Sequence, residues 1–523
     1  MSVSSALHPP LSTSSSRVSA ATLVGLVVRR EMTDHLRSFR FLALCSLMLV
    51  LMPLGAFIDV RDFERRTAWA AALREDARKH LEQSERPDWG FDTFRPDPAL
   101  RAIRDPQPLS FLAMGLDALL PTYWQFDSMG SSAGPPVTPE FSRGGLIGDV
   151  DVLFVVQAVL GLLALLLAFD AVSGEKEAGT LRAALGNSVP RVLLLLGKYL
   201  GLLFTVLSPL VLGTLAALVV AQAMGVPLAS AATVARVALV LFAAAAYVVA
   251  LSGLGLLVSA TTHRSRTSLV LLLVLWVGLI LVLPRFATVL SAALRPVAPA
   301  QVADHTQRVS ILDLDKERRA ELAAMWKEIT GRDELPESPE FRALNAGQAP
   351  ELRDQILRYL ERQKEIDRGF YERKRSLIRD IDGTRDKQLA AQRRLTSVIS
   401  RLSPAAVFGF VATDAAGTGE LERRRLEQQV LAHQQTLESV YWDTSPGFML
   451  VACGGKCEYS DEHYESLGRQ APAKYGDLPV FARSEASLGE IFRHSLGDLG
   501  LLVLFGLASL GGAALAFNRY DVR

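Results

Sequence analysis

Hydrophobic residues are concentrated in six long runs that contain almost no charged side chains. The runs cover residues 40–59, 152–169, 199–224, 237–260, 267–284 and 499–517. Each is long enough to cross a hydrocarbon core of about 30 Å as a helix. Helices are expected because the bilayer core offers no water to satisfy the backbone, so its polar groups must bond within the segment. The pattern predicts an all-α polytopic membrane protein with six transmembrane helices.

Charged residues are displaced into the segments between these runs. Half of the 523 residues are hydrophobic and 21% are charged, with a formal net charge of +1. Two long polar blocks, residues 60–151 and 285–498, carry most of the charge. A nearly balanced charge gives no reason to expect a nucleic-acid partner.

Lysine and arginine in the short connections indicate the orientation of the chain. Basic residues precede the first run and occupy the connection 170–198, whereas the connection after Met224 offers only Arg236. Since short cytoplasmic loops are enriched in Lys and Arg, both termini are expected in the cytoplasm. The two polar blocks would then be extracytoplasmic insertions.

The two ends of the chain are expected to remain outside the hydrocarbon. Residues 1–19 are rich in serine and predict a disordered tail, and residues 518–523 a short cytoplasmic tail. Residues 20–39 combine apolar positions with a basic cluster, as in a helix that lies on the inner leaflet and contacts membrane lipid.

The polar blocks have helical patterns of their own. The first begins with the helical stretch "RDFERRTAWAAALREDARKHLEQ" and continues as Pro-rich sequence that predicts irregular structure. In the second, apolar residues between 356 and 378 recur at helical spacing, which predicts a helical hairpin or coiled coil within 351–402. Residues 403–412 are apolar but too short to span, so packing under the hairpin is favoured over resting on the outer leaflet.

The connection 170–198 carries an unusual stretch, "GEKEAGTLRAALGNSVPR". Glu175 and Glu177 provide carboxylates where basic residues are the norm, and Gly179 permits a tight turn. Leu181 and Leu185 are four residues apart, so on a helix they share one face. A cytoplasmic partner is therefore expected to dock on this loop and its short helix.

The extended segment "SGEKEAGTLRAALGNSVPRVLLLLGKYLG" resembles the cytoplasmic loop of type-2 ABC transporter permeases. The six-span layout, the basic N-terminal helix and the ending "AFNRYDVR" are similar too, in particular to a bacterial branch with large extracytoplasmic domains. The resemblance implies a permease of an ATP-driven exporter in the bacterial inner membrane, paired with an ATPase subunit and with a second copy or a paralogous permease.

The resemblance also assigns roles within this loop. Glu177, Gly179, Thr180 and Leu181 would contact the ATPase, with Arg182 and Leu185 on the following helix. Ala178 stands where many relatives carry a basic residue.

No catalytic motif is found in the chain. A P-loop requires G-x-x-x-x-G-K-[ST] after a strand, and "GGKC" at 454–457 lacks the first glycine. We therefore expect a chain that is not an enzyme and holds no cofactor, with ATP and Mg²⁺ bound by the separate ATPase. The competing interpretation is a membrane scaffold whose ATPase drives motion of the outer domains without moving a substrate across. A sensor is disfavoured because the inner loops are too short for an output domain.

Two cysteines lie in the second polar block, in "VACGGKCEYSDEHYE". Outside the cytoplasm an oxidising environment would favour a disulfide between Cys453 and Cys457. A metal site that adds His463 is the weaker alternative, since two Cys and one His match no common zinc spacing.

Overall fold

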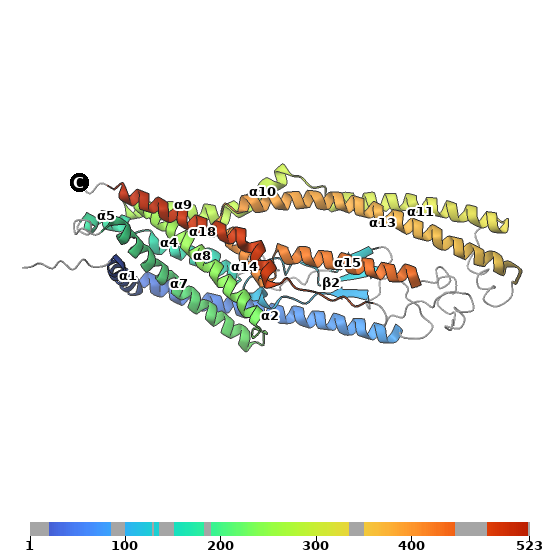
Figure 1. Cartoon of the computed structure of the whole chain (residues 1–523), viewed down its shortest axis with the longest axis horizontal. Helices are drawn as coiled ribbons and strands as arrows, with labels where there is room; N and C mark the ends of the chain where they lie inside the picture. Colours follow the sequence, from blue (N-terminus) through green and yellow to red (C-terminus); the bar gives the residue numbers. More distant parts are fainter. Residues whose placement is uncertain are drawn as a thin grey trace, which may run out of the picture.

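The computed structural model describes residues 20–84, 100–127, 130–134, 151–182, 190–333, 350–444 and 479–520. Figure 1 shows an elongated molecule with a bundle of helices at one end and long helices that extend away from the other. Both the N-terminal helix and the C-terminus lie at the bundle end (Figure 1).

Six helices among the described residues are long and apolar enough to cross a membrane, as predicted. The first is α2 (Phe39–Ser84), the third α7 (Arg191–Ala223), the fourth α8 (Ala231–Thr261) and the sixth α18 (Leu488–Asn518). The second is composed of α3 (Val152–Phe154), η4 (Val155–Leu160) and α4 (Gly161–Ala168). The fifth is composed of α9 (Ser265–Trp276), η5 (Val277–Val282) and α10 (Leu283–Leu294).

Several of these helices continue well past the ends of the apolar runs. The first run stops at residue 59, but α2 is 46 residues long and reaches Ser84 without a break. Likewise α10 continues to Leu294, and α18 begins at Leu488. Hydrophobicity locates the bilayer along a helix, whereas the polar residues that follow are helix formers and prolong it.

The second and fifth spans each contain a π-helical turn, η4 and η5. Such turns leave backbone groups without their usual partners and often occur at functional sites. At η4, side chains of neighbouring helices bond to the backbone. The Tyr247 hydroxyl donates to the Gln157 carbonyl at 2.6 Å, and the Trp276 indole donates to the Ala158 carbonyl at 3.2 Å.

Small residues allow α18 to pack closely on α8. A Cβ on Gly506 would lie 2.9 Å from Val249 Cγ1, and one on Gly512 would lie 3.2 Å from Leu257 Cδ1. In lipid, close backbone approach of this kind supplies the packing that holds helices together. Gly500 and Gly511 have open space beside them and do not share this role.

The short apolar segment predicted to pack rather than rest on lipid forms α14 (Pro404–Ala416). Ser403 caps its first turn, and the helix packs against α8 and α18. Phe408 stacks on Tyr247 with ring centroids 5.3 Å apart, and the Gln157 amide donates to the Ala405 carbonyl at 2.8 Å. Packing is confirmed, although the main partners are spans and not the hairpin.

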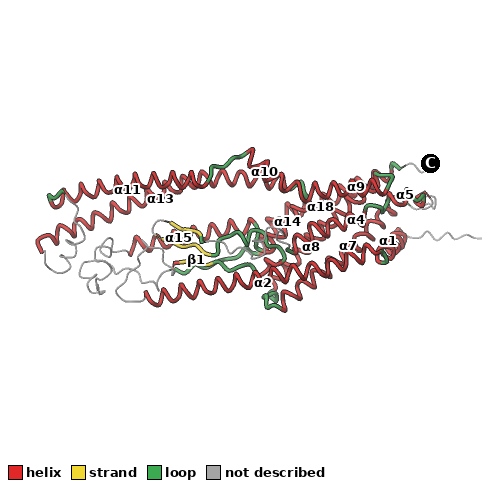
Figure 2. Tube along the Cα trace, turned by 180° about the vertical axis from the view of Figure 1, so that it is seen from behind, coloured by secondary structure: helices red, strands yellow, loops and turns green. Residues whose placement is uncertain are grey.

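The stretch 351–402 does not fold back on itself as a hairpin, because it forms one continuous helix, α13 (Pro350–Ser400). Its helical partner is α11 (Ala300–Thr330), which precedes it in the chain and lies beside it in both views (Figures 1 and 2). The two helices are called the α11–α13 hairpin below. Trp326 meets Tyr359 edge to face at 5.1 Å, and Arg318 pairs with Asp367 at 2.6 Å. The connection between the two helices falls outside the described residues.

The first polar block is more ordered than predicted. Where irregular structure was expected, the chain forms the short helix η2 (Pro108–Phe111) and an antiparallel three-stranded sheet. The strands are β1 (Arg101–Ile103), β2 (Tyr123–Asp127) and β3 (Gly130–Ala133). The sheet shares a small core with α15 (Glu420–Thr444), in which Ala102 and Phe126 meet Leu426 and Val430. Strands this short show too few alternations to be recognised from sequence.

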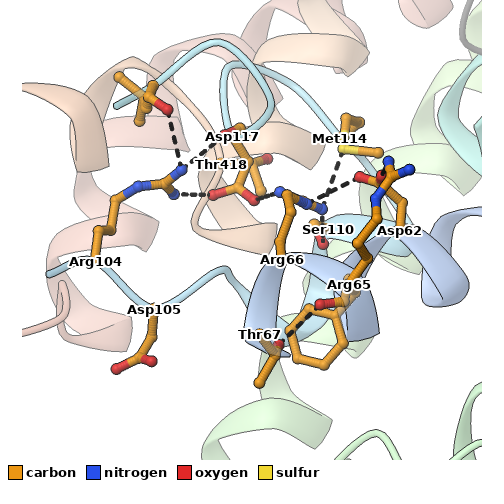
Figure 3. A network of polar contacts seen from close by, with 12 residues as sticks. Asp62, Arg65, Arg66, Thr67, Arg104, Asp105, Ser110, Met114, Asp117 and Thr418 are labelled. Carbon is orange, nitrogen blue, oxygen red and sulfur yellow. Dashed lines mark hydrogen bonds and ion pairs between the residues drawn. The ribbon is translucent and has the colours of Figure 1, made fainter. Parts of the chain in front are cut away.

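A buried ion-pair network joins the extension of α2 to this block (Figure 3). Arg66 pairs with Asp62 of its own helix at 2.9 Å and with Asp117. The Asp117 carboxylate also pairs with Arg104. The Arg104 guanidinium donates a second bond to the backbone carbonyl of Asp117 at 2.9 Å. The half-exposed Arg65 also lies 2.5 Å from the Asp62 carboxylate, so three cations face two carboxylates that have little access to water.

Replacing the central cation of this network should be strongly destabilising. In Arg66→Met, Asp62 keeps only the half-exposed Arg65 and Asp117 keeps only Arg104, so we expect a loss of about 3 kcal/mol, the low end of the cost of breaking a buried ion pair. We expect a clear fall in the apparent unfolding temperature of the detergent-purified protein. The control is Arg74→Ala, because the Arg74–Asp105 pair is exposed and such pairs contribute at most about 1 kcal/mol. Equal effects of the two variants would show that the network is not structurally important.

Candidate functional site

The connection that follows α4 contains a short helix, α5 (Ser173–Glu177), set against the end of the bundle. Its first turn is anchored by Ser259 of α8, whose hydroxyl oxygen accepts from the backbone amides of Val172 and Ser173 at 3.0 Å each. Gly179 then adopts a φ of +73°, a conformation typical of the residue that ends a helix. Residues 170–182 and the helix ends that they contact are called the α5 junction below.

A buried lysine ties α5 to two other helices. The Lys198 ammonium of α7 lies 2.8 Å from the Glu175 carboxylate and 2.8 Å from the Glu31 carboxylate of α1 (Ala20–Leu36). Only 3% of its side chain is exposed. Glu175 was expected to face an ATPase, but here it serves as an internal partner. Its pairing fixes α1, α5 and α7 relative to one another.

Two glycines bring α1 close enough to α7 for this contact. A Cβ on Gly197 would lie 2.6 Å from Val27 Cγ1, and one on Gly201 would lie 2.7 Å from the Glu31 Cβ. Nearby on α1, burial lowers the pKa of His35 below its ordinary value, and this effect exceeds the opposing influence of Glu31. His35 is therefore neutral at pH 7 and does not compete with Lys198 for that carboxylate.

Lys176 contacts the C-terminal ends of two more spans, α8 and α18. Its ammonium donates to the Ala260 carbonyl, and to the Thr262 carbonyl at 3.1 Å, where α8 ends. It also lies 5.0 Å from the centroid of the Tyr520 ring, just after α18. Because the C-terminal end of a helix carries partial negative charge, a cation at this position is favourable.

Glu177 and Asp170 extend the contacts to the remaining spans. The Glu177 carboxylate accepts from the Ser265 amide at 3.1 Å, which caps the first turn of α9. Asp170 pairs with Arg40 of α2 at 2.7 Å. Together with Lys198, Ser259 and Tyr520, these contacts join the α5 junction to the ends of all five other spans.

The predicted contact residues divide into two groups. Glu177, Gly179 and Thr180 are exposed, together with Ala178, and are consecutive along the chain; Arg182 is exposed too, beyond Leu181. Leu181 is fully buried in the core of the bundle. Its predicted role in an exposed apolar contact is therefore not what the structure shows, because it anchors the junction instead. Leu185 lies outside the described residues.

Several residues of the junction were missed by sequence reasoning. They are Glu31, Lys176, Arg191 and Lys198, of which Arg191 donates to the carbonyls of Asn518 and Tyr520 at 2.8 and 3.0 Å. A lysine at the edge of an apolar run, as Lys198 is, either reaches for the headgroups or forms a buried pair, and only the fold distinguishes these.

The comparisons with known proteins agree with the architecture of the bundle and the junction. A family model described as ABC-2 family transporter protein matches residues 26–325, more than half of the chain. The chain therefore belongs to this family and is a multi-pass membrane permease of the ABC transporter class. The match begins in α1 and ends in α11, so it includes the whole α5 junction except the tail after α18. No curated protein matches the chain.

The chemistry of the site is ion pairing and capping. Within the described residues, no three His, Cys, Asp or Glu side chains are grouped so that they could hold a metal ion. Cys453, Cys457 and His463 lie outside those residues, so the disulfide and the alternative metal site stay predictions.

The buried lysine of the junction gives a direct test of its role. In Lys198→Met, two carboxylates would face each other without a cation, at a cost of about 3–5 kcal/mol. We expect α1 to detach, with faster trypsin cleavage at Arg29 and Arg30 and a lower unfolding temperature. Adding Glu31→Gln and Glu175→Gln to Lys198→Met should restore much of the loss, because no buried charge then remains. A triple variant as unstable as the single one would contradict the assignment.

Proposed function

We propose that this permease belongs to an ATP-driven exporter in which a separate ATPase subunit docks on the exposed surface of the α5 junction. The observation that carries the proposal is that one short segment contacts the ends of all five other spans through Asp170, Ser173, Glu175, Lys176 and Glu177. A segment with this many attachments can pass a displacement to the whole bundle. The same segment presents an exposed surface from Glu177 to Thr180.

The contacts suit transmission because they are short and charge-assisted. Buried ion pairs such as Lys198–Glu175 resist separation, since pulling them apart would leave an unpaired charge in a low-dielectric region. A push on the exposed surface would therefore move α5 together with the helix ends it binds. ATP and Mg²⁺ would be held by the ATPase alone, and this chain would contribute no catalytic group.

A second permease chain, either another copy or a paralogue, is the further part of the proposal. In its most apolar window the fifth span is only 11% buried by the rest of the chain, against 56% for the second span. Its exposed side chains include Val270, Val274 and Val282. A second chain or membrane lipid would have to cover this surface, and the membrane would be the bacterial inner membrane.

A mechanical role without transport is the second candidate. It is favoured by the unbroken continuation of α2 and α10 from the spans into the extended part of the molecule. Such continuity would carry movement of the bundle to the hairpin directly. ATP-dependent movement of a substrate into sealed vesicles would support the exporter, and its absence beside normal ATP turnover would favour the mechanical role.

The proposed topology places both termini and the α5 junction in the cytoplasm. In a chain whose three native cysteines are replaced by serine, His263→Cys should be protected from an impermeant thiol reagent in intact cells. Gln428→Cys on α15 should react, since both positions are exposed and only the side of the membrane differs. The opposite labelling pattern would reverse the orientation.

Docking of the ATPase can be tested at Glu177. Glu177→Lys places a positive charge on the proposed surface and should release the ATPase from the detergent-solubilised permease. Glu177→Gln is the matched control, because its amide oxygen can still accept from the Ser265 amide and keep α9 capped. Loss of co-purification in the Lys variant alone is the expected result.

The second docking variant is Leu185→Asp, which would put a charge into an apolar contact and can cost several kcal/mol when desolvated. Full co-purification and ATP turnover in both Glu177→Lys and Leu185→Asp would mean that the loop is only a connector. Membrane insertion serves as the folding control for both variants.

A further inference from the structure

The α8 and α18 helices form a paired unit that runs the length of the bundle. Each is 31 residues long, or about 46 Å at 1.5 Å per residue. They pack more extensively on each other than any other two helices among the described residues. A Cβ on Gly253 of α8 would lie 3.1 Å from the Ser509 Cβ of α18, so the two helices are in close contact here as they are at Gly506 and Gly512. Neither helix can move far without the other.

At the junction end, one side chain holds both helices of this pair. The Lys176 ammonium binds the last carbonyls of α8 and lies over the Tyr520 ring that follows α18. Arg191 supplements this contact by donating to the Asn518 and Tyr520 carbonyls. The chain after α18 is therefore attached to the α5 junction and does not hang free at Tyr520.

At the opposite end, the pair is attached to the base of the hairpin. Arg401, which directly follows α13, forms a two-pronged contact with Asp498 of α18 at 2.6 and 3.0 Å. The His494 imidazole of α18 lies 2.8 Å from the Asp414 carboxylate of α14. Arg236 of α8 donates to the Ala486 carbonyl at 3.0 Å, just before α18 begins. Two-pronged Arg–carboxylate pairs fix orientation as well as distance.

We propose that Lys176 is a positioning residue that locks the α8–α18 pair to the α5 junction, and that the pair transmits the position of the junction to the base of the α11–α13 hairpin. The inference rests on the proposed function only in assuming that movement begins at the α5 junction. It adds that this movement changes the position of the hairpin, through the α8–α18 pair and its contacts with Lys176 and Arg401. Rigid elements with firm contacts at both ends are one physical means of such coupling.

The test measures whether a change at Lys176 reaches the hairpin. The full chain, with its three native cysteines replaced by serine, carries spin labels at Ala68→Cys on α2 and Gln388→Cys on α13, both exposed positions. It is reconstituted in lipid nanodiscs, and the distance distribution between the labels is recorded. Lys176→Met, which removes the charge but keeps an apolar stem, should broaden or displace this distribution.

Two controls and a double variant sharpen the result. Lys176→Arg keeps a cation, and Arg519→Ala changes an exposed side chain of the same tail, so both should retain the original distribution. In an Arg401→Gln background the effect of Lys176→Met should become smaller, because the contact that leads directly to α13 is broken while those of His494 and Arg236 remain. Tyr520→Leu provides a second inner variant if Lys176→Met does not fold.

Unchanged distances in Lys176→Met and Tyr520→Leu would overturn the proposal. An effect of Lys176→Met that simply adds to that of Arg401→Gln would overturn it too, since independent effects mean no transmission. The measurement requires no ATPase. Failure of an ATPase to co-purify would therefore count against the proposed function while leaving this test intact.

Discussion

One buried charge determines how the junction end of the molecule is assembled. An ammonium group as enclosed as that of Lys198 is tolerated only when carboxylates pair with it. Glu31 and Glu175 meet this requirement from two different helices, which must therefore both be in place when α7 is buried. Three features thus depend on one another: the close approach of α1 at Gly197 and Gly201, the position of α5, and the burial of Lys198.

The apolar bundle is held between two polar layers, and each combines ion pairs with bonds to helix ends. At the junction end, Lys198 pairs with two carboxylates, while Lys176 and Glu177 satisfy the termini of α8 and α9. At the other end, Arg66–Asp62 and Arg401–Asp498 are ion pairs, while Arg236 donates to the Ala486 carbonyl just before α18. Free backbone groups are available only where a helix stops.

Sequence patterns located the spans but not the ends of the helices. Hydrophobicity reports contact with lipid, and nothing in it distinguishes a helix that stops at residue 59 from α2, which continues to Ser84. The connection that forms the α5 junction was also singled out, yet its residues could not be assigned individually. Glu175 and Glu177 are chemically alike and two positions apart, but one binds a buried lysine and the other caps a helix. Leu181 matched an exposed motif and is buried. These outcomes depend on tertiary neighbours that local sequence does not encode.

The unbroken course of α2 has a consequence for the scale of any movement. The part of this helix beyond the first apolar run is about 38 Å long at 1.5 Å per residue. The helix continues through Pro53, and a tilt by about 5° of the part beyond this proline would swing the far tip by about 3 Å over that length. The helix thus acts as a lever arm: rotations too small to open the bundle become displacements comparable to a hydrogen bond at its tip. Such a lever works only while it stays stiff at the point where it leaves the membrane, which is where Arg66 and its partners brace it.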